Sequence, residues 1–211
     1  MIKREEDILK DVRRCMDMDV ESEGLLSEGD EDSLTLNDII KSKMEEAATQ
    51  VESSAPSYLL EAGHPIDGEV YFEDQGSGWV LLPDDFMRLV VFEMNDWERP
   101  VRDVLLPDSP LYALQKSRYK GLRGTPQKPV CVLVMRPEGK ALEFYSCKDK
   151  EAEISKAMYL PYPRKDRDGG LDVCERLYPA IVYMTAALVY ASCGETEKAS
   201  LMTELSKSKM I

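Results

Sequence analysis

The chain has 211 residues, of which 43% are hydrophobic and 32% are charged, so it carries enough apolar residues to bury a core. Its formal net charge of −13 comes from 40 acidic and 27 basic residues. Residues 1–61 hold 17 acidic and 7 basic side chains, a net of −10, whereas residues 62–211 hold 23 and 20, a net of −3. This balance excludes a protein that coats DNA through a broadly basic surface, so any contact with nucleic acid must be local.

The residue types that usually carry catalysis or bind metals are sparse. The single histidine, His64, precedes a proline in a turn, and no nucleophile motif lies near it. The five cysteines are widely spaced without a Cys-x-x-Cys pair, so zinc and redox motifs are absent. The charged opening is unlike a secretory leader, and reduced thiols in a cytosolic setting are expected. We therefore expect neither an enzyme nor a cofactor.

Residues 1–33 are expected to form an N-terminal appendage. Apolar residues at helical spacing predict a helix over residues 4–18, and residues 19–33 form an acidic stretch without periodicity, interpreted as a flexible linker. The next helix begins at Thr35, where Asp38 completes a capping box, and continues to about residue 53.

The middle of the chain changes to the period of β-strands. Two hairpins are predicted, one pairing residues 69–73 with 79–82 and one pairing residues 130–135 with 140–145. Further strands are expected over residues 86–94, 101–105 and 151–160. Together these segments predict an antiparallel β-domain over residues 64–171.

Two helices are predicted at the C-terminal end, separated by Gly194. Residues 177–193 run without a charge, at the short limit for a membrane span, and a helix buried by protein fits this segment better. Its apolar side chains surround the helix, so we expect either the inserted sheet or a neighbouring subunit to cover part of it. The candidate oligomer-packing residues are Tyr178, Ile181, Val182, Met184, Leu188 and Val189. The predicted fold is α+β, a bundle of N- and C-terminal helices (residues 34–63 and 172–211) with the β-domain inserted between them.

One segment of this acidic chain is strongly basic. It contains five basic residues with no acidic residue between them: Lys116, Arg118, Lys120, Arg123 and Lys128. Glycines at 121 and 124 predict a loop, and the interleaved Tyr119 would suit single-stranded nucleic acid. Salt bridges to an acidic neighbour, contact with a DNA backbone and a solvated loop all remain open for this segment.

Several short motifs follow one another in a characteristic order along the chain. A Pro-Asp-Asp turn at residues 83–85 leads into an Arg-Leu strand and a Trp-x-x-Pro segment at residues 97–100. Further motifs of this kind lie at residues 115–119, 121–124 and 128–130, and at both helical ends, at residues 36–40, 55–60, 178–180, 186–188 and 194–199. In this order of motifs, roughly residues 34–211 resemble the head–tail connector (adaptor, tail-tubular-like) proteins of tailed bacteriophages.

The resemblance implies a structural protein of the virion neck, assembled in the host cytoplasm. It implies a homo-oligomeric ring of about twelve copies that binds the portal protein and the next tail component. The genome would pass through the channel with at most non-specific contact, and neither a membrane nor a catalytic residue is implied.

Two other classes compete with this interpretation. A cellular scaffold or regulatory module would be a stable monomer or dimer that binds a peptide on its helical hairpin. A hydrolase would place Asp84, Asp85 or Glu93 in a concave pocket with raised pKa values. The helix at residues 177–193 separates the ring from the module, because a monomer must cover this helix alone.

Overall fold

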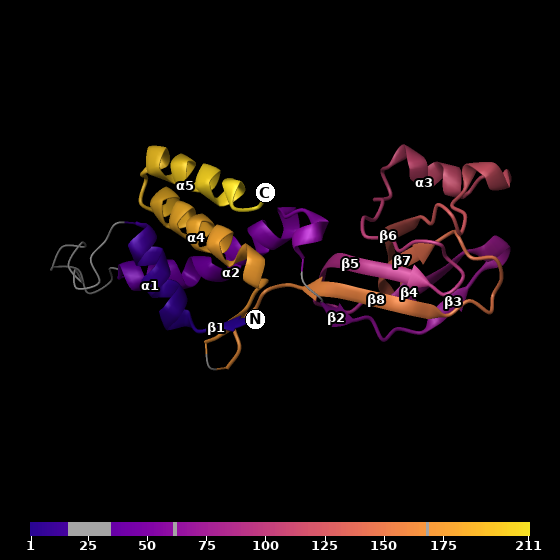
Figure 1. The fold of residues 1–211 in the computed structure, drawn as a ribbon, viewed down its shortest axis with the longest axis horizontal. Coiled ribbons are helices and arrows are strands. Elements are labelled where there is room, and N and C mark those ends of the chain that lie inside the picture. Colours follow the sequence, from indigo (N-terminus) through magenta and orange to yellow (C-terminus); the bar gives the residue numbers. More distant parts are fainter. Residues whose placement is uncertain (17–34, 61–62, 168) are drawn as a thin grey trace. The chain divides into compact units, whose positions relative to one another are not determined.

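The computed structural model describes residues 1–16, 35–60, 63–167 and 169–211, without the side chains of Gln75 and Lys120. These residues form two compact units (Figure 1). The helical unit comprises Met1–Glu61 and Pro163–Ile211, and the β-unit comprises Ala62–Tyr162. The described residues contain five α-helices and three antiparallel sheets, which confirms the predicted α+β class. The chain leaves the β-unit at Tyr162, earlier than the expected boundary at residue 171.

Helices from both ends of the chain pack together in the helical unit. They are α1 (Glu5–Cys15), α2 (Leu36–Ser54), α4 (Tyr178–Ser192) and α5 (Thr196–Ser208). Helix α4 contacts each of the other three. A short pairing of β1 (Ile2–Lys3) with β9 (Leu171–Asp172) joins the N-terminal residues to the segment before α4. Because α1 buries Ile8 and Val12 completely, it is an integral part of this unit rather than an appendage. The predicted linker over residues 19–33 lies outside the described residues.

Local signals set the ends of these helices as predicted. The Thr35 hydroxyl accepts a hydrogen bond from the Asp38 backbone, and the Asp38 side chain accepts one from the Thr35 backbone. Pro179 occupies the first turn of α4, where its missing N–H costs nothing. Gly194 follows α4 with φ +80°, a left-handed conformation that favours glycine.

Helix α4 is apolar around its circumference, and the chain covers this helix by itself. Of the six predicted packing residues, Ile181, Val182, Met184 and Val189 are buried, and Tyr178 and Leu188 are half-buried. Helices α1, α2 and α5 contact α4, a source of cover that our expectation of a sheet or a neighbouring subunit did not include. Among the described residues, no helix combines the length and the apolar character needed to cross a bilayer.

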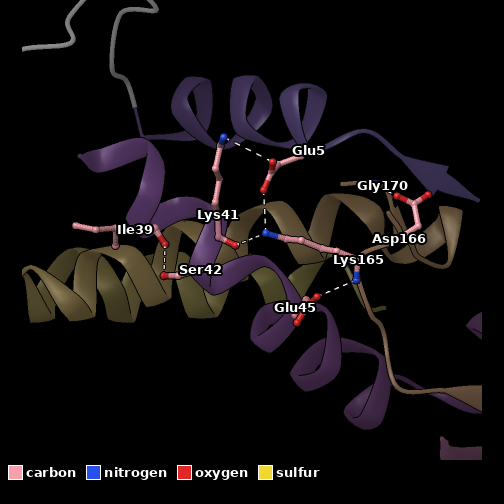
Figure 2. Close-up of polar contacts among 8 residues, drawn as sticks. All are labelled: Glu5, Ile39, Lys41, Ser42, Glu45, Lys165, Asp166 and Gly170. Atoms are coloured by element: carbon pink, nitrogen blue, oxygen red, sulfur yellow. Dashed lines mark hydrogen bonds and ion pairs between the residues drawn. The ribbon is translucent and has the colours of Figure 1, made fainter. Parts of the chain in front are cut away.

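A polar cluster holds the segment that enters the helical unit after Tyr162 (Figure 2). The Lys165 ammonium donates to Glu5 Oε1 at 2.8 Å and to the Lys41 carbonyl at 2.7 Å. The Lys165 backbone N–H donates to Glu45 Oε1 at 2.8 Å. Lys41 adds an ion pair to the other oxygen of Glu5 at 3.6 Å. This cluster ties α1, α2 and residues 163–171 together, and the Lys165 contact lowers the pKa of Glu5.

The β-unit contains two sheets. The smaller sheet has the order β2-β8-β5, and the larger has the order β3-β4-β7-β6. Their strands are β2 (His64–Pro65), β3 (Val70–Phe72), β4 (Gly78–Leu81), β5 (Phe86–Met94), β6 (Cys131–Arg136), β7 (Gly139–Phe144) and β8 (Ile154–Pro161). Both predicted hairpins are present, as β3–β4 and β6–β7. The predicted strand over residues 101–105 is wrong. Only single bridges form at Val101 and Leu105, since prolines at 100 and 107 limit continued pairing.

Each face of the larger sheet packs against apolar side chains. On one face, Phe144 stacks on Phe92 of the smaller sheet, and Trp97 meets both rings edge-on. On the other face, a second cluster is centred on three buried side chains, Val132, Val134 and Ala141. Leu105 and Tyr112, from the segment around α3 (Pro110–Gln115), pack onto this second cluster. The larger sheet therefore supports α3 and the residue before the segment that contains it.

Candidate interaction surface

The predicted basic residues belong to a longer segment, residues 106–128, which we call the arm. Its first half is fixed to the larger sheet by Tyr112, whose hydroxyl donates to Glu143 Oε2 at 3.3 Å. The Tyr145 hydroxyl donates to the same carboxylate, and burial together with this contact raises the pKa of Tyr145 well above its usual range. The Leu105 N–H donates to the Cys131 carbonyl at 2.9 Å just before the arm begins.

The buried side chain of Gln115 links α3 to the loop that forms the second half of the arm. Gln115 is 5% exposed, donates through Nε2 to the Leu111 carbonyl at 3.0 Å and accepts from the Gly124 N–H at 2.7 Å. Gly124 lies so close to the sheet that a Cβ atom there would sit 2.5 Å from Ser146 Oγ. Glycine at 124 thus permits the loop to close against the β-unit.

Large apolar side chains of the arm face solvent. Five of them are at least 38% exposed: Leu106, Leu111, Leu114, Tyr119 and Leu122. Leu111 and Leu114 lie three positions apart on α3, so they share a face of this short helix. Sequence patterning did not reveal this surface, because such spacing is the same in a core-facing helix.

The structure places the five predicted basic residues along this same arm. Lys116, Arg118 and Lys128 are exposed, and Arg123 is half-buried. The side chain of Lys120 is not among those that the structure describes. Lys116 lies 4.6 Å from the centre of the Tyr112 ring, and Arg118 donates to the Tyr119 hydroxyl at 3.0 Å. Among the described side chains, Lys116, Arg118 and Lys128 form no ion pair with a carboxylate. Their charges are therefore not neutralised by direct pairing within the described part of the chain.

The carboxylates considered for a hydrolase lie at opposite ends of β5, with Asp84 and Asp85 just before the strand and Glu93 near its end. Asp85 immediately precedes β5, and its carboxylate accepts from the Tyr159 hydroxyl at 2.9 Å. Burial and this contact raise the pKa of Tyr159 to about 12. Glu93 lies near the other end of β5, roughly 26 Å away at about 3.3 Å per residue. The structure therefore does not bring Asp85 and Glu93 into one site.

His64 lies on β2, where it pairs with Tyr159, and the centres of the two rings are 6.0 Å apart. Within the described ranges, no group of three or more His, Cys, Asp or Glu residues is arranged to hold a metal ion.

No protein-family model matches the chain. No curated protein matches it either.

Proposed function

We propose that this chain is a non-catalytic ring subunit that joins the portal of a tailed bacteriophage to the tail. In this proposal, the terminal helices form a bundle that lines up beside those of the next copy, and the arm contacts a neighbouring copy. About twelve copies would close the ring in the virion neck, after assembly in the host cytoplasm. The portal protein and the next tail component are the proposed partners on its two sides, and the genome passes through its channel.

The main support for this proposal is the surface of the arm. It combines five exposed apolar side chains with basic residues on a chain that is otherwise acidic. Residues 106–128 contain five basic residues and Asp108, a net of +4, so the rest of the −13 chain has a net of −17. Grouped exposed apolar side chains are typical of a surface that is buried against a partner. A second copy of this acidic chain offers the complementary charge, which favours self-association.

The division of the chain is a second line of support. Segments from both ends share one unit, and the β-unit is inserted between them. The resemblance to connector proteins implies a β-domain inserted between helical segments, so this division of the chain supports the proposal.

A cellular scaffold or regulatory module is the second candidate, and α4 favours it. Because α1, α2 and α5 already cover this helix, the helical unit has the cover that a stable monomer needs. The exposed arm distinguishes the candidates, because a ring buries this surface against another copy.

The test is the mass of the full chain in solution, measured by light scattering after size exclusion over a concentration series. We expect the mass to rise from the 23.9 kDa monomer to large assemblies as concentration increases. The double variant Leu111→Glu/Leu114→Glu should remain monomeric, because two buried carboxylates would oppose the contact. The control is Met135→Glu on β6, where the native side chain is 76% exposed and lies outside the arm.

Two results would count against the ring. A monomer of the unmodified chain at every concentration would move the scaffold module ahead. Assembly of the arm variant to the same extent as the Met135 variant would show that the arm is not the contact.

A further inference from the structure

A hollow of about 580 Å³ opens beside the arm in the β-unit. Its walls come from the arm's second half (Arg118 and residues 123–126), the segment after β7 (residues 145–150) and Gly76. Its position is distinct from the apolar face of α3.

Basic side chains dominate the wall of the hollow. Arg118, Arg123, Lys148 and Lys150 line it, against a single carboxylate, Asp149. Asp149 accepts a hydrogen bond from the Glu151 N–H at 2.9 Å. Lys150 lies 3.4 Å from Asp74 Oδ1, but both side chains are largely exposed, so solvent screens this pair. The Asp96 carboxylate lies beside the wall, where it accepts from the Lys148 N–H at 2.6 Å. Four basic side chains thus face the carboxylates of Asp74, Asp96 and Asp149, a net of +1 on a chain whose net charge is −13.

The floor of the hollow adds hydroxyl donors on a fixed backbone. Ser146 is 1% exposed, and its Oγ accepts from the Val130 N–H at 2.8 Å, which leaves its proton to donate. Thr125 Oγ1 accepts from the Lys128 N–H at 3.2 Å in the same way. Gly76, at φ +75°, packs against the Cys147 carbonyl, and the Cys147 N–H donates to the Gly76 carbonyl at 3.0 Å. The floor is therefore held by backbone hydrogen bonds.

The thiol of Cys147 does not oppose an anion at this site. Burial, with the nearby Asp96 carboxylate, raises the pKa of Cys147 to about 12. The thiol is therefore neutral at physiological pH and places no negative charge beside the four cations.

We infer that this hollow binds phosphate groups of a nucleic-acid backbone. Guanidinium, ammonium and hydroxyl donors are the groups with which proteins hold phosphate oxygens. The hollow is larger than one phosphate ion needs and is open to solvent, which suits a continuous strand. Tyr119 is 60% exposed, and the Arg118 guanidinium lies over one face of its ring, 5.0 Å from the ring centre, so an unpaired base can stack on the opposite face. This inference concerns a single chain and does not require the ring.

The test is fluorescence anisotropy of labelled duplex and single-stranded DNA with the full chain, from about 50 to 200 mM salt. The variant is Arg118→Ala/Lys148→Ala, and the control is Arg99→Ala/Arg102→Ala, which removes the same charge from exposed positions of the β-unit. If both residues contact phosphates, the magnitude of the log–log salt slope should fall in the first variant by about 1.8 on duplex DNA and by about 1.4 on single-stranded DNA, because each contact contributes about 0.9 or about 0.7. The control should keep the original slope. Thermal unfolding of both variants checks that they fold.

Competition with inorganic triphosphate separates the sources of phosphate. Displacement of DNA by triphosphate at equal phosphate concentration would identify a small phosphate as the ligand, whereas retention of DNA supports the backbone. Equal slopes in the two double variants would overturn the inference, as would the absence of binding to DNA and triphosphate at low salt. The monomeric Leu111→Glu/Leu114→Glu variant should still bind DNA, which separates a failure of this site from a failure of the ring.

Discussion

Replacing Lys165 with methionine should destabilise the helical unit by about 1–2 kcal/mol. The change removes the hydrogen bonds of the ammonium to Glu5 Oε1 at 2.8 Å and to the Lys41 carbonyl at 2.7 Å (Figure 2). Hydrogen bonds to charged groups contribute about 1.5–3 kcal/mol when buried, and exposed ion pairs about 0.2–1 kcal/mol. The side chains of Lys165 and Glu5 are 26% and 24% exposed, so the expected loss lies between these limits. Methionine retains most of the apolar stem.

The assay is urea unfolding followed by circular dichroism, in a double-mutant cycle with Glu5→Gln. The coupling free energy between the two positions should be about 0.5–1 kcal/mol at neutral pH. The exposed Lys43–Glu46 pair on α2, at 2.9 Å, is the control and should give a coupling of about 0.3–0.5 kcal/mol. A coupling of zero between Lys165 and Glu5 would show that their contact does not stabilise the helical unit.

The pH dependence gives the same prediction a second check. Lys165 holds the folded-state pKa of Glu5 below its ordinary value of 4.5. The ion pair therefore contributes its full stability above pH 4.5 and loses it as the pH falls through the lower folded-state pKa. The difference in unfolding free energy between the native chain and the Lys165→Met variant should therefore decrease as the pH falls below 4.5.

Three further substitutions test other parts of the fold. Glu52→Gln on α2 should raise the unfolding free energy at neutral pH by up to about 1 kcal/mol, because burial of the carboxylate raises its pKa. This gain should shrink as the pH falls through the raised pKa of Glu52, measured by urea unfolding at several pH values, and a loss of stability at neutral pH would contradict it. Gly124→Ala should cost about 1–3 kcal/mol by forcing the arm away from Ser146, and an unchanged melting temperature would contradict this close approach. Ile8→Ala should cost about 2–4 kcal/mol, since this side chain is fully buried, and a surface-like effect below about 0.5 kcal/mol would show that α1 is not packed.

Local signals in the sequence predicted the elements well. The capping box at Thr35 and Asp38 depends on residues three positions apart, and hairpin β6–β7 depends on a short turn between two apolar runs. Both are specified by near neighbours along the chain, so the pattern alone identifies them.

Contacts between distant segments could not be predicted from the same patterns. The buried stripe of α1, with Ile8 and Val12, predicts an amphipathic helix but does not identify α4 as its partner. Because α1 was not assigned to the helical bundle, α4 was expected to need cover from the inserted sheet or from a neighbouring subunit. The basic half of the arm was visible because acidic residues are missing there. The apolar half of the arm could not be recognised, because Leu111 and Leu114 have the spacing of a core helix. Their exposure depends on the contact of Tyr112 with the larger sheet, which fixes the orientation of α3.

The most direct test of the proposed ring is photo-crosslinking from the arm. A benzophenone amino acid replaces Leu114 in the full chain, and crosslinked products are mapped by mass spectrometry. If the arm contacts a neighbouring copy, the probe at position 114 should give crosslinked products of dimer mass, and the same probe at Met135, which lies outside the arm, should give few. Crosslinked products of monomer mass alone, at concentrations where the Met135→Glu variant assembles, would contradict the proposed ring.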